Sequence, residues 1–282
     1  MSDTVWTDVI AHTSPVEHGV LVAVGIIAVV VYGWGWLQTG RASVWRLTAW
    51  CAGVAALLVS VLPVMERWAQ RSFTGHMVQH LVMIVVAAPL VVVARPVATS
   101  RALGWVPRRT TTTERSLARR WRSHGAIASA AAFVLVLYAT HLTGIYDAAL
   151  RNRFVHDVEH VAYVCSAIAL WAALRSSGRE AAFDRVGAVF GVIGGSALLG
   201  VVLISASSPL IDTYADRLGP VDALADQRAA ASLMWVGGMA TTLPLLLLSV
   251  WSWASTEDRI AHRRESLTDA RGSDARSGRV AP

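Results

Sequence analysis

The stretch RNRFVHDVEHVAYVCSAIALW, which runs from Arg151 to Trp171, combines a charged beginning with an apolar continuation. Two histidines, two acids and two arginines stand in its first ten residues, and the remainder is almost wholly apolar. About 20 predominantly apolar residues are enough for an α-helix to cross a bilayer. The stretch therefore predicts a membrane-spanning helix with a group of ionisable side chains at one of its ends.

Seven blocks of this kind occur along the 282 residues. The chain is 54% hydrophobic and only 16% charged, whereas a soluble domain carries about 25% charged residues. We therefore expect an all-α, polytopic integral membrane protein in which residues 1–254 form one bundle of seven transmembrane helices. Residues 255–282 are polar and Arg-rich, and we expect a disordered tail there. The seven spans are expected near 17–37, 44–64, 74–94, 126–146, 154–174, 183–206 and 230–254.

The basic residues indicate which side of the membrane each loop faces. All 25 are Arg, and 19 of them fall in four segments that seven spans place on one side, namely 38–46, 95–124, 175–185 and 255–282. Cytoplasmic loops of membrane proteins are enriched in basic residues. The distribution predicts an N-terminus outside and a cytoplasmic C-terminus. Because the charge is spread over loops between helices, it indicates contact with the lipid bilayer and no nucleic-acid partner.

Histidines concentrate on the side that this topology places outside. Two pairs lie four residues apart, His76 with His80 and His156 with His160, so each pair shares one face of its helix. His141 lies near the outer end of another helix. A single histidine at a helix end is usually an interfacial polar residue. Five at one depth, four of them paired, predict a shared metal or cofactor site, and imidazole suits copper among other transition metals.

Four other side chains are candidates for an additional or supporting role. Asp157 and Glu159 lie between the histidines of the second pair and could orient the second nitrogen of a metal-bound imidazole. Asp226 and Met234 lie roughly two helical turns apart near the last span and could add an oxygen and a thioether. Thioether sulfur favours copper(I). The alternatives are a solvated loop for the segment that contains Asp226 and simple packing for Met234.

Four segments follow one another between His76 and Trp235: HMVQHLVMIVVAAPLVVVARP, THLTGIYDAAL, VEHVAYVCSAIALW and DQRAAASLMW. Together and in this order they resemble the seven-helix CtaG-type assembly factors of caa-type cytochrome c oxidase. The resemblance implies a role in maturing the haem–copper oxidase through copper handling, with no catalytic reaction. It also implies that the five histidines named above and Asp226 form the polar signature of the family.

The expected function is that of a copper-binding assembly factor, or chaperone, in the bacterial cell (inner) membrane, with copper-containing oxidase subunits as partners.

Two other classes of function stay open. Histidines from two helices could hold haem in a membrane electron carrier, although no CxxCH motif for covalent haem is present. The histidines could also form the entry site of a copper permease, but the inner half of the predicted bundle has few polar residues. A retinal protein is excluded because its Schiff base needs Lys, and the chain has none.

Overall fold

The computed structural model describes residues 15–39, 43–106, 112–175 and 179–277, and every regular element in these ranges is helical. The elements are α1 (Pro15–Thr39), α2 (Val44–Ser60), α3 (Pro63–Arg71), α4 (Phe73–Leu81), the π-helix η2 (Val82–Ala87), α5 (Ala88–Ala94), α6 (Pro96–Ala102), α7 (Thr112–Leu142), α8 (Ile145–Arg151), α9 (Arg153–Leu174), α10 (Arg179–Ser205), α11 (Asp212–Leu218) and α12 (Pro220–Ser277).

The long helices agree with the predicted membrane spans. Six helical stretches in the described ranges are long and apolar enough to cross a membrane. The pair α2 and α3, which is bent by 50°, makes a seventh when it is counted as one span. The chain is therefore an all-helical, multi-pass membrane protein, as the sequence predicts.

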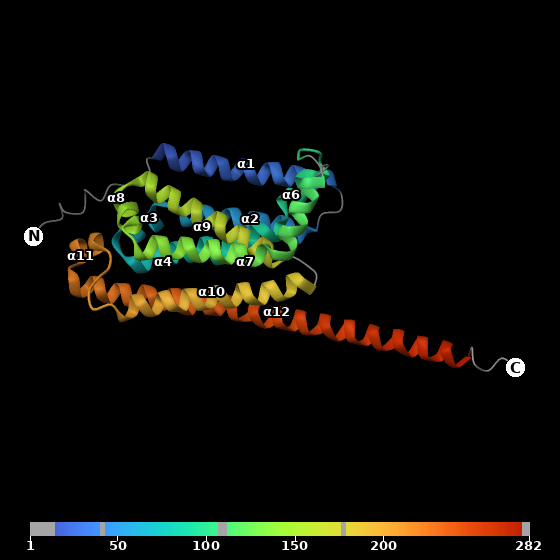
Figure 1. The fold of residues 1–282 in the computed structure, drawn as a ribbon. Helices are drawn as coiled ribbons and strands as arrows, with labels where there is room; N and C mark the ends of the chain where they lie inside the picture. Colours follow the sequence, from blue (N-terminus) through green and yellow to red (C-terminus); the bar gives the residue numbers. More distant parts are fainter. Residues whose placement is uncertain (1–14, 40–42, 107–111, 176–178, 278–282) are drawn as a thin grey trace, which may run out of the picture.

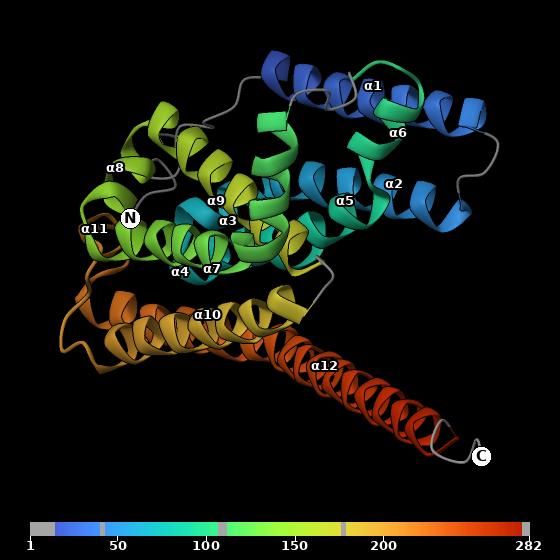
Figure 2. The ribbon, with the colours of Figure 1, turned by 45° about the vertical axis from the view of Figure 1, so that its right-hand side comes forward.

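Successive long helices run in alternating directions (Figure 1), so the beginning of α1 and the end of α12 lie at opposite ends of the bundle. The short helices α3, α8 and α11 gather at the end where α1 begins, and α6 lies at the other end. Turned by 45°, the ribbon shows α1 on the outside of the bundle (Figure 2), where it packs against α2 and α6. Which end faces the cytoplasm stays a prediction.

Several helices begin at the end of the bundle where α3, α8 and α11 gather, and the local sequence explains where each one starts. Pro63 begins α3 after Leu62, because proline cannot supply the amide of a helix interior but suits the first turn. Ser72 and Asn152 then begin α4 and α9, and their side chains accept hydrogen bonds from amides of the first turn. Gly219 has a φ of 83°, which favours glycine, at the turn before α12. These breaks set where the histidine-bearing helices start.

The third span, which runs through α4, η2 and α5, changes from α-helix to π-helix and back along its length. In the π-helical segment η2 an amide donates to the carbonyl five residues earlier, as Ala88 does to Met83. Pro89 follows and has no amide hydrogen, so the carbonyl of Ile84 lacks that donor. The indole Nε1–H of Trp171 donates to this carbonyl over 3.0 Å. The bond ties the third span to α9, and these are the two spans that carry the paired histidines.

Two helices extend beyond the predicted apolar blocks. Helix α7 begins at Thr112, inside the segment that the sequence assigns to a loop, and α12 begins at Pro220. At its other end α12 continues to Ser277, within the segment 255–282 for which the sequence predicts a disordered tail, and residues 278–282 lie outside the described residues. The hydrophobic pattern marks only the lipid-embedded part of a helix, and these extensions are rich in Arg and Ala, which favour helix.

Candidate metal-binding site

Helices α4 and α9 bring their histidine pairs face to face. His76 and His80 lie on successive turns of α4, and His156 and His160 lie on the first turns of α9; we call these four residues the histidine cluster. Ring centroids lie 5.7 Å apart for His76 and His156, and 5.4 Å apart for His80 and His160. None of the four is more than 8% exposed. The predicted encounter of the two pairs is thus observed.

The histidine cluster and Glu159 contain two groups of potential metal ligands. One consists of His76, His156 and His160, and the other of His76, His80 and Glu159. Within each group the ligand atoms lie within 4.8 Å of one another. In the second group the two Nε2 atoms are 3.1 Å apart, and Glu159 Oε2 lies 3.8 Å from His76 Nε2. These spacings allow several ligand atoms to contact one ion.

Several atoms of these groups are buried without a hydrogen-bond partner among the described residues. They are Nδ1 of His76, Nδ1 of His80, Nε2 of His160 and both carboxylate oxygens of Glu159. A buried polar atom without a partner costs about 1–3 kcal/mol, and more when the group is charged. The coordination of a metal ion would satisfy His160 Nε2 and the Glu159 oxygens, so the donor set fits a metal.

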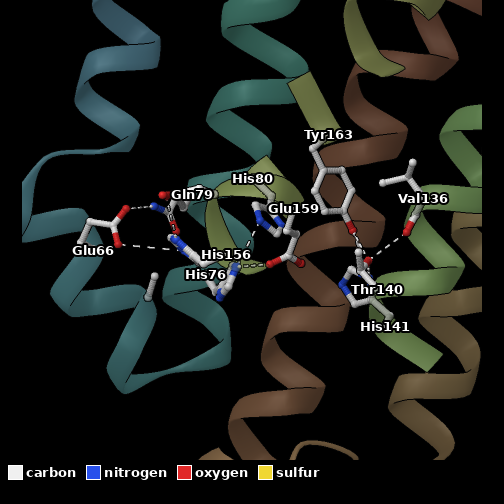
Figure 3. A network of polar contacts seen from close by, with 12 residues as sticks. Glu66, His76, Gln79, His80, Val136, Thr140, His141, His156, Glu159 and Tyr163 are labelled. Atoms are coloured by element: carbon white, nitrogen blue, oxygen red, sulfur yellow. Dashed lines mark hydrogen bonds and ion pairs between the residues drawn. The ribbon is translucent and has the colours of Figure 1, made fainter. Parts of the chain in front are cut away.

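Glu66 and Gln79 extend the polar network from the histidine cluster toward α3 (Figure 3). The Gln79 side-chain amide donates to Glu66 Oε1 over 3.0 Å and to the Ser60 carbonyl over 2.8 Å. Glu66 Oε2 lies 4.0 Å from Nε2 of His156. The spacing of Gln79 from His76 and His80 places all three on one face of α4, a signal that could have identified it. Nothing in the sequence pointed to Glu66, because its position depends on the bend between α2 and α3.

His141 lies beside the histidine cluster and belongs to neither ligand group. Its Nδ1 lies 2.9 Å from the Leu137 carbonyl and 3.1 Å from the hydroxyl of Thr140. Thr140 in turn contacts the Tyr163 hydroxyl at 2.5 Å, and Tyr163 lies between His141 and His80 (Figure 3). The Nε2 atom of His141 is buried without a hydrogen-bond partner in the described part of the chain. Its membership of the site therefore stays a prediction.

Aromatic rings, which the sequence interpretation missed, line the histidine cluster. The ring of Tyr146 lies 4.5 Å from that of His76, and the ring of Tyr163 lies 4.4 Å from that of His80. Phe73 and Tyr214 stack behind Tyr146. Burial raises the pKa of Tyr146 and Tyr214 above the usual range for tyrosine, so both stay protonated and add no charge. The rings keep water away from the imidazoles.

The remaining predicted residues lie at different places. Asp157 is on the exposed side of α9, where one carboxylate oxygen pairs with Arg153 at 3.6 Å and the other lies 4.0 Å from Nδ1 of His156, so its predicted role in orienting a ligand stays a prediction. Asp226 lies against the start of α4 and accepts hydrogen bonds from the amides of Phe73 and Thr74 and from the Thr74 hydroxyl. It therefore positions the helix that carries His76. Met234 lines an apolar cavity of about 90 Å³ further along the bundle.

The fold and this site define a class: a multi-pass helical membrane protein with buried histidines from two spans at one end. A family model described as cytochrome c oxidase caa3 assembly factor matches residues 30–256. The chain belongs to this family of cytochrome c oxidase caa3 assembly factors. The resemblance that the sequence motifs suggested is confirmed.

Mycobacterial proteins are similar to the chain. Uncharacterized proteins Mb0105 of Mycobacterium bovis and MT0111 of Mycobacterium tuberculosis are each 24% identical over 274 residues, which cover 88% of this chain and 40% of the relative. Uncharacterized protein ML1998 of Mycobacterium leprae is 24% identical over 284 residues, covering 89% of this chain and 41% of the relative. The chain thus spans about two fifths of the length of these relatives. No solved structure matches the chain.

Proposed function

We propose that the chain binds copper in the histidine cluster and helps to deliver it to the copper-containing subunits of cytochrome c oxidase. The proposal follows from family membership, which gives the process, and from the two ligand groups, which give the cargo. The observation that carries it is the set of buried imidazole and carboxylate atoms, several of them without hydrogen-bond partners, within reach of one ion.

The chemistry of the ligand groups suits copper. Imidazole nitrogen binds copper in either oxidation state, and copper(II) binds nitrogen and oxygen ligands more tightly than other divalent first-row metals do. Neither Cys51 nor Cys165 belongs to a ligand group. Thiolate-rich sites retain copper(I) strongly, whereas a site of imidazoles suits a carrier that must release its cargo.

The two alternative functions lack comparable support. A haem needs space for a planar macrocycle between axial histidines of two helices, whereas the rings of Tyr146 and Tyr163 pack against His76 and His80, with centroids 4.5 and 4.4 Å apart. A permease needs polar groups along a path through the bundle. The cavity beyond the histidine cluster is lined instead by apolar side chains such as Leu81, Ile84 and Phe133.

The test compares His76→Ala with His262→Ala in cells that contain the oxidase. His76 belongs to both ligand groups, whereas His262 is an exposed histidine on the polar part of α12 and serves as the matched control. We expect His76→Ala to lower copper affinity by at least about 10–100-fold, the range found when residues that support a metal site are replaced. Oxidase in the same membranes should be short of copper.

Copper per purified chain and oxidase activity per unit of haem are the measurements. Equal thermal unfolding midpoints in detergent would show that both variants fold. Wild-type levels of bound copper and of oxidase activity in His76→Ala would contradict the proposal. A Soret absorption band in purified protein without copper would favour the haem carrier instead.

A further inference from the structure

The two ligand groups overlap in one residue and differ in charge. His76 belongs to both. The first group is completed by the imidazoles of His156 and His160, which are neutral when they bind a metal. The second is completed by His80 and by the carboxylate of Glu159, which is only 2% exposed. An ion can therefore meet either three imidazoles, or two imidazoles and a carboxylate, and His76 belongs to both sets.

Glu159 has an environment that a cation would stabilise. It lies between the α9 positions of His156 and His160, and neither of its carboxylate oxygens accepts a hydrogen bond from the described residues. Its one ion-pair contact in the described part of the chain is with His76, at 3.8 Å. A buried carboxyl group either keeps its proton or, when charged, is paired with a positive charge or a metal ion. This observation is independent of the spacing of the histidines.

A second buried carboxylate near the histidine cluster, Glu66, already has partners. Its Oε1 accepts a hydrogen bond from the side-chain amide of Gln79, and its Oε2 lies 4.0 Å from Nε2 of His156. It belongs to neither ligand group. The two groups therefore differ mainly in the presence of Glu159.

Electrostatics gives the two groups different preferences for the oxidation state of copper. In a buried environment the attraction between unit charges is several-fold stronger than in water. A carboxylate ligand stabilises a divalent ion about twice as strongly as a monovalent ion, because the energy scales with the charge. Three neutral imidazoles supply no such charge and suffice for copper(I), which accepts low coordination numbers.

We propose that the pocket offers copper two overlapping positions that share His76: a cuprous position with His156 and His160, and a cupric position with His80 and Glu159. The inference rests on the proposed copper function and deepens it. The same pocket can then hold copper in either oxidation state, with two of the three ligands differing between the positions and His76 common to both.

The experiment measures the affinities for both ions in Glu159→Gln and His156→Ala. Cuprous affinity is measured by competition with a chromophoric cuprous chelator under a reductant, and cupric affinity by competition with a cupric chelator in air. We expect Glu159→Gln to weaken cupric binding by about 10-fold or more and to change cuprous binding by less than about 3-fold. His156→Ala should show the opposite pattern, and His76→Ala should weaken both.

Equal unfolding midpoints and an unchanged His262→Ala control confirm that the changes are local. If Glu159→Gln and His156→Ala weaken both ions by the same factor, copper has one shared position and this inference is wrong, while the proposed function stands. If the wild-type chain binds neither ion, the proposed function fails and the inference fails with it.

Discussion

The two ends of the bundle differ in how their ionisable side chains are stabilised. At the end where α3, α8 and α11 gather, the histidine cluster, Glu66 and Glu159 are buried. At the end where α6 lies, Arg95 and Arg175 are exposed, and the buried Asp184 contacts His124 at 3.1 Å. Exposed arginines keep their water and suit the headgroups of anionic lipids. Buried imidazoles and carboxylates have lost their water, and only a ligand or a partner compensates for that loss.

The largest expected effect concerns which end faces the cytoplasm. The excess of arginines in alternate loops predicts that the end of α12 is cytoplasmic and the segment around α11 is outside. A reporter enzyme that is active only outside the cytoplasm should therefore work when it is inserted at α11 and fail when it is fused after Ser255. The reverse pattern would place the histidine cluster on the cytoplasmic side and remove the basis for delivery to an outer copper centre.

A smaller effect, on the free energy of unfolding, is expected when the hydrogen bonds of Gln79 behind the histidine cluster are removed. Gln79→Ala removes the donor to Glu66 and to the Ser60 carbonyl, both buried. Leaving such groups unsatisfied should lower the free energy of unfolding by about 1–3 kcal/mol. The exposed Gln38 at the end of α1 provides the control Gln38→Ala. Unfolding in denaturing detergent measures the difference, and equal stabilities would mean that the network does not support the fold.

The carboxylate of Asp226 at the start of α4 should contribute somewhat less to the stability of the fold. Asp226 accepts hydrogen bonds from two amides at the start of this helix, and loss of such a cap costs about 1 kcal/mol. We expect Asp226→Ala to lower the unfolding midpoint and to weaken copper binding modestly by displacing His76. Asp222→Ala, at an exposed position on α12, should do neither. Loss of copper with unchanged stability would indicate instead that Asp226 binds the ion.

The smallest effect on copper binding is expected from the arginines at the end of the bundle where α6 lies. Arg175 is exposed after α9 and lies on the α6 side of the bundle, away from the histidine cluster. Arg175→Gln should leave the copper affinity unchanged within about two-fold, because charges across a span are too distant to act on the site. A large change measured by the same chelator competition would show that the two ends are coupled, and would break the comparison between them.

The sequence was informative where a local pattern determines the answer. Apolar blocks of about 20 residues predicted the spans, and the four-residue spacing of His76 with His80 and of His156 with His160 predicted two paired faces. The meeting of those faces followed from a count of spans and sides. These inferences needed no knowledge of which helix packs on which.

Other features depended on helix packing, which no local pattern gives. His141 lies beside the histidine cluster, but its side chain folds back so that Nδ1 contacts Leu137 and Thr140 of its own helix. Glu66 and Tyr146 reach the site from short helices at breaks between spans, where hydropathy carries little signal. Asp226 was a candidate ligand by type, and its contacts with α4 explain it as a helix cap.

X-ray absorption at the copper edge of the loaded, purified chain identifies the atoms that bind the ion. We expect a coordination shell of nitrogen and oxygen with the scattering pattern of imidazole, and the loss of that pattern in His76→Ala. A shell dominated by sulfur, or an imidazole pattern that persists unchanged in His76→Ala, would contradict the assignment of copper to the histidine cluster.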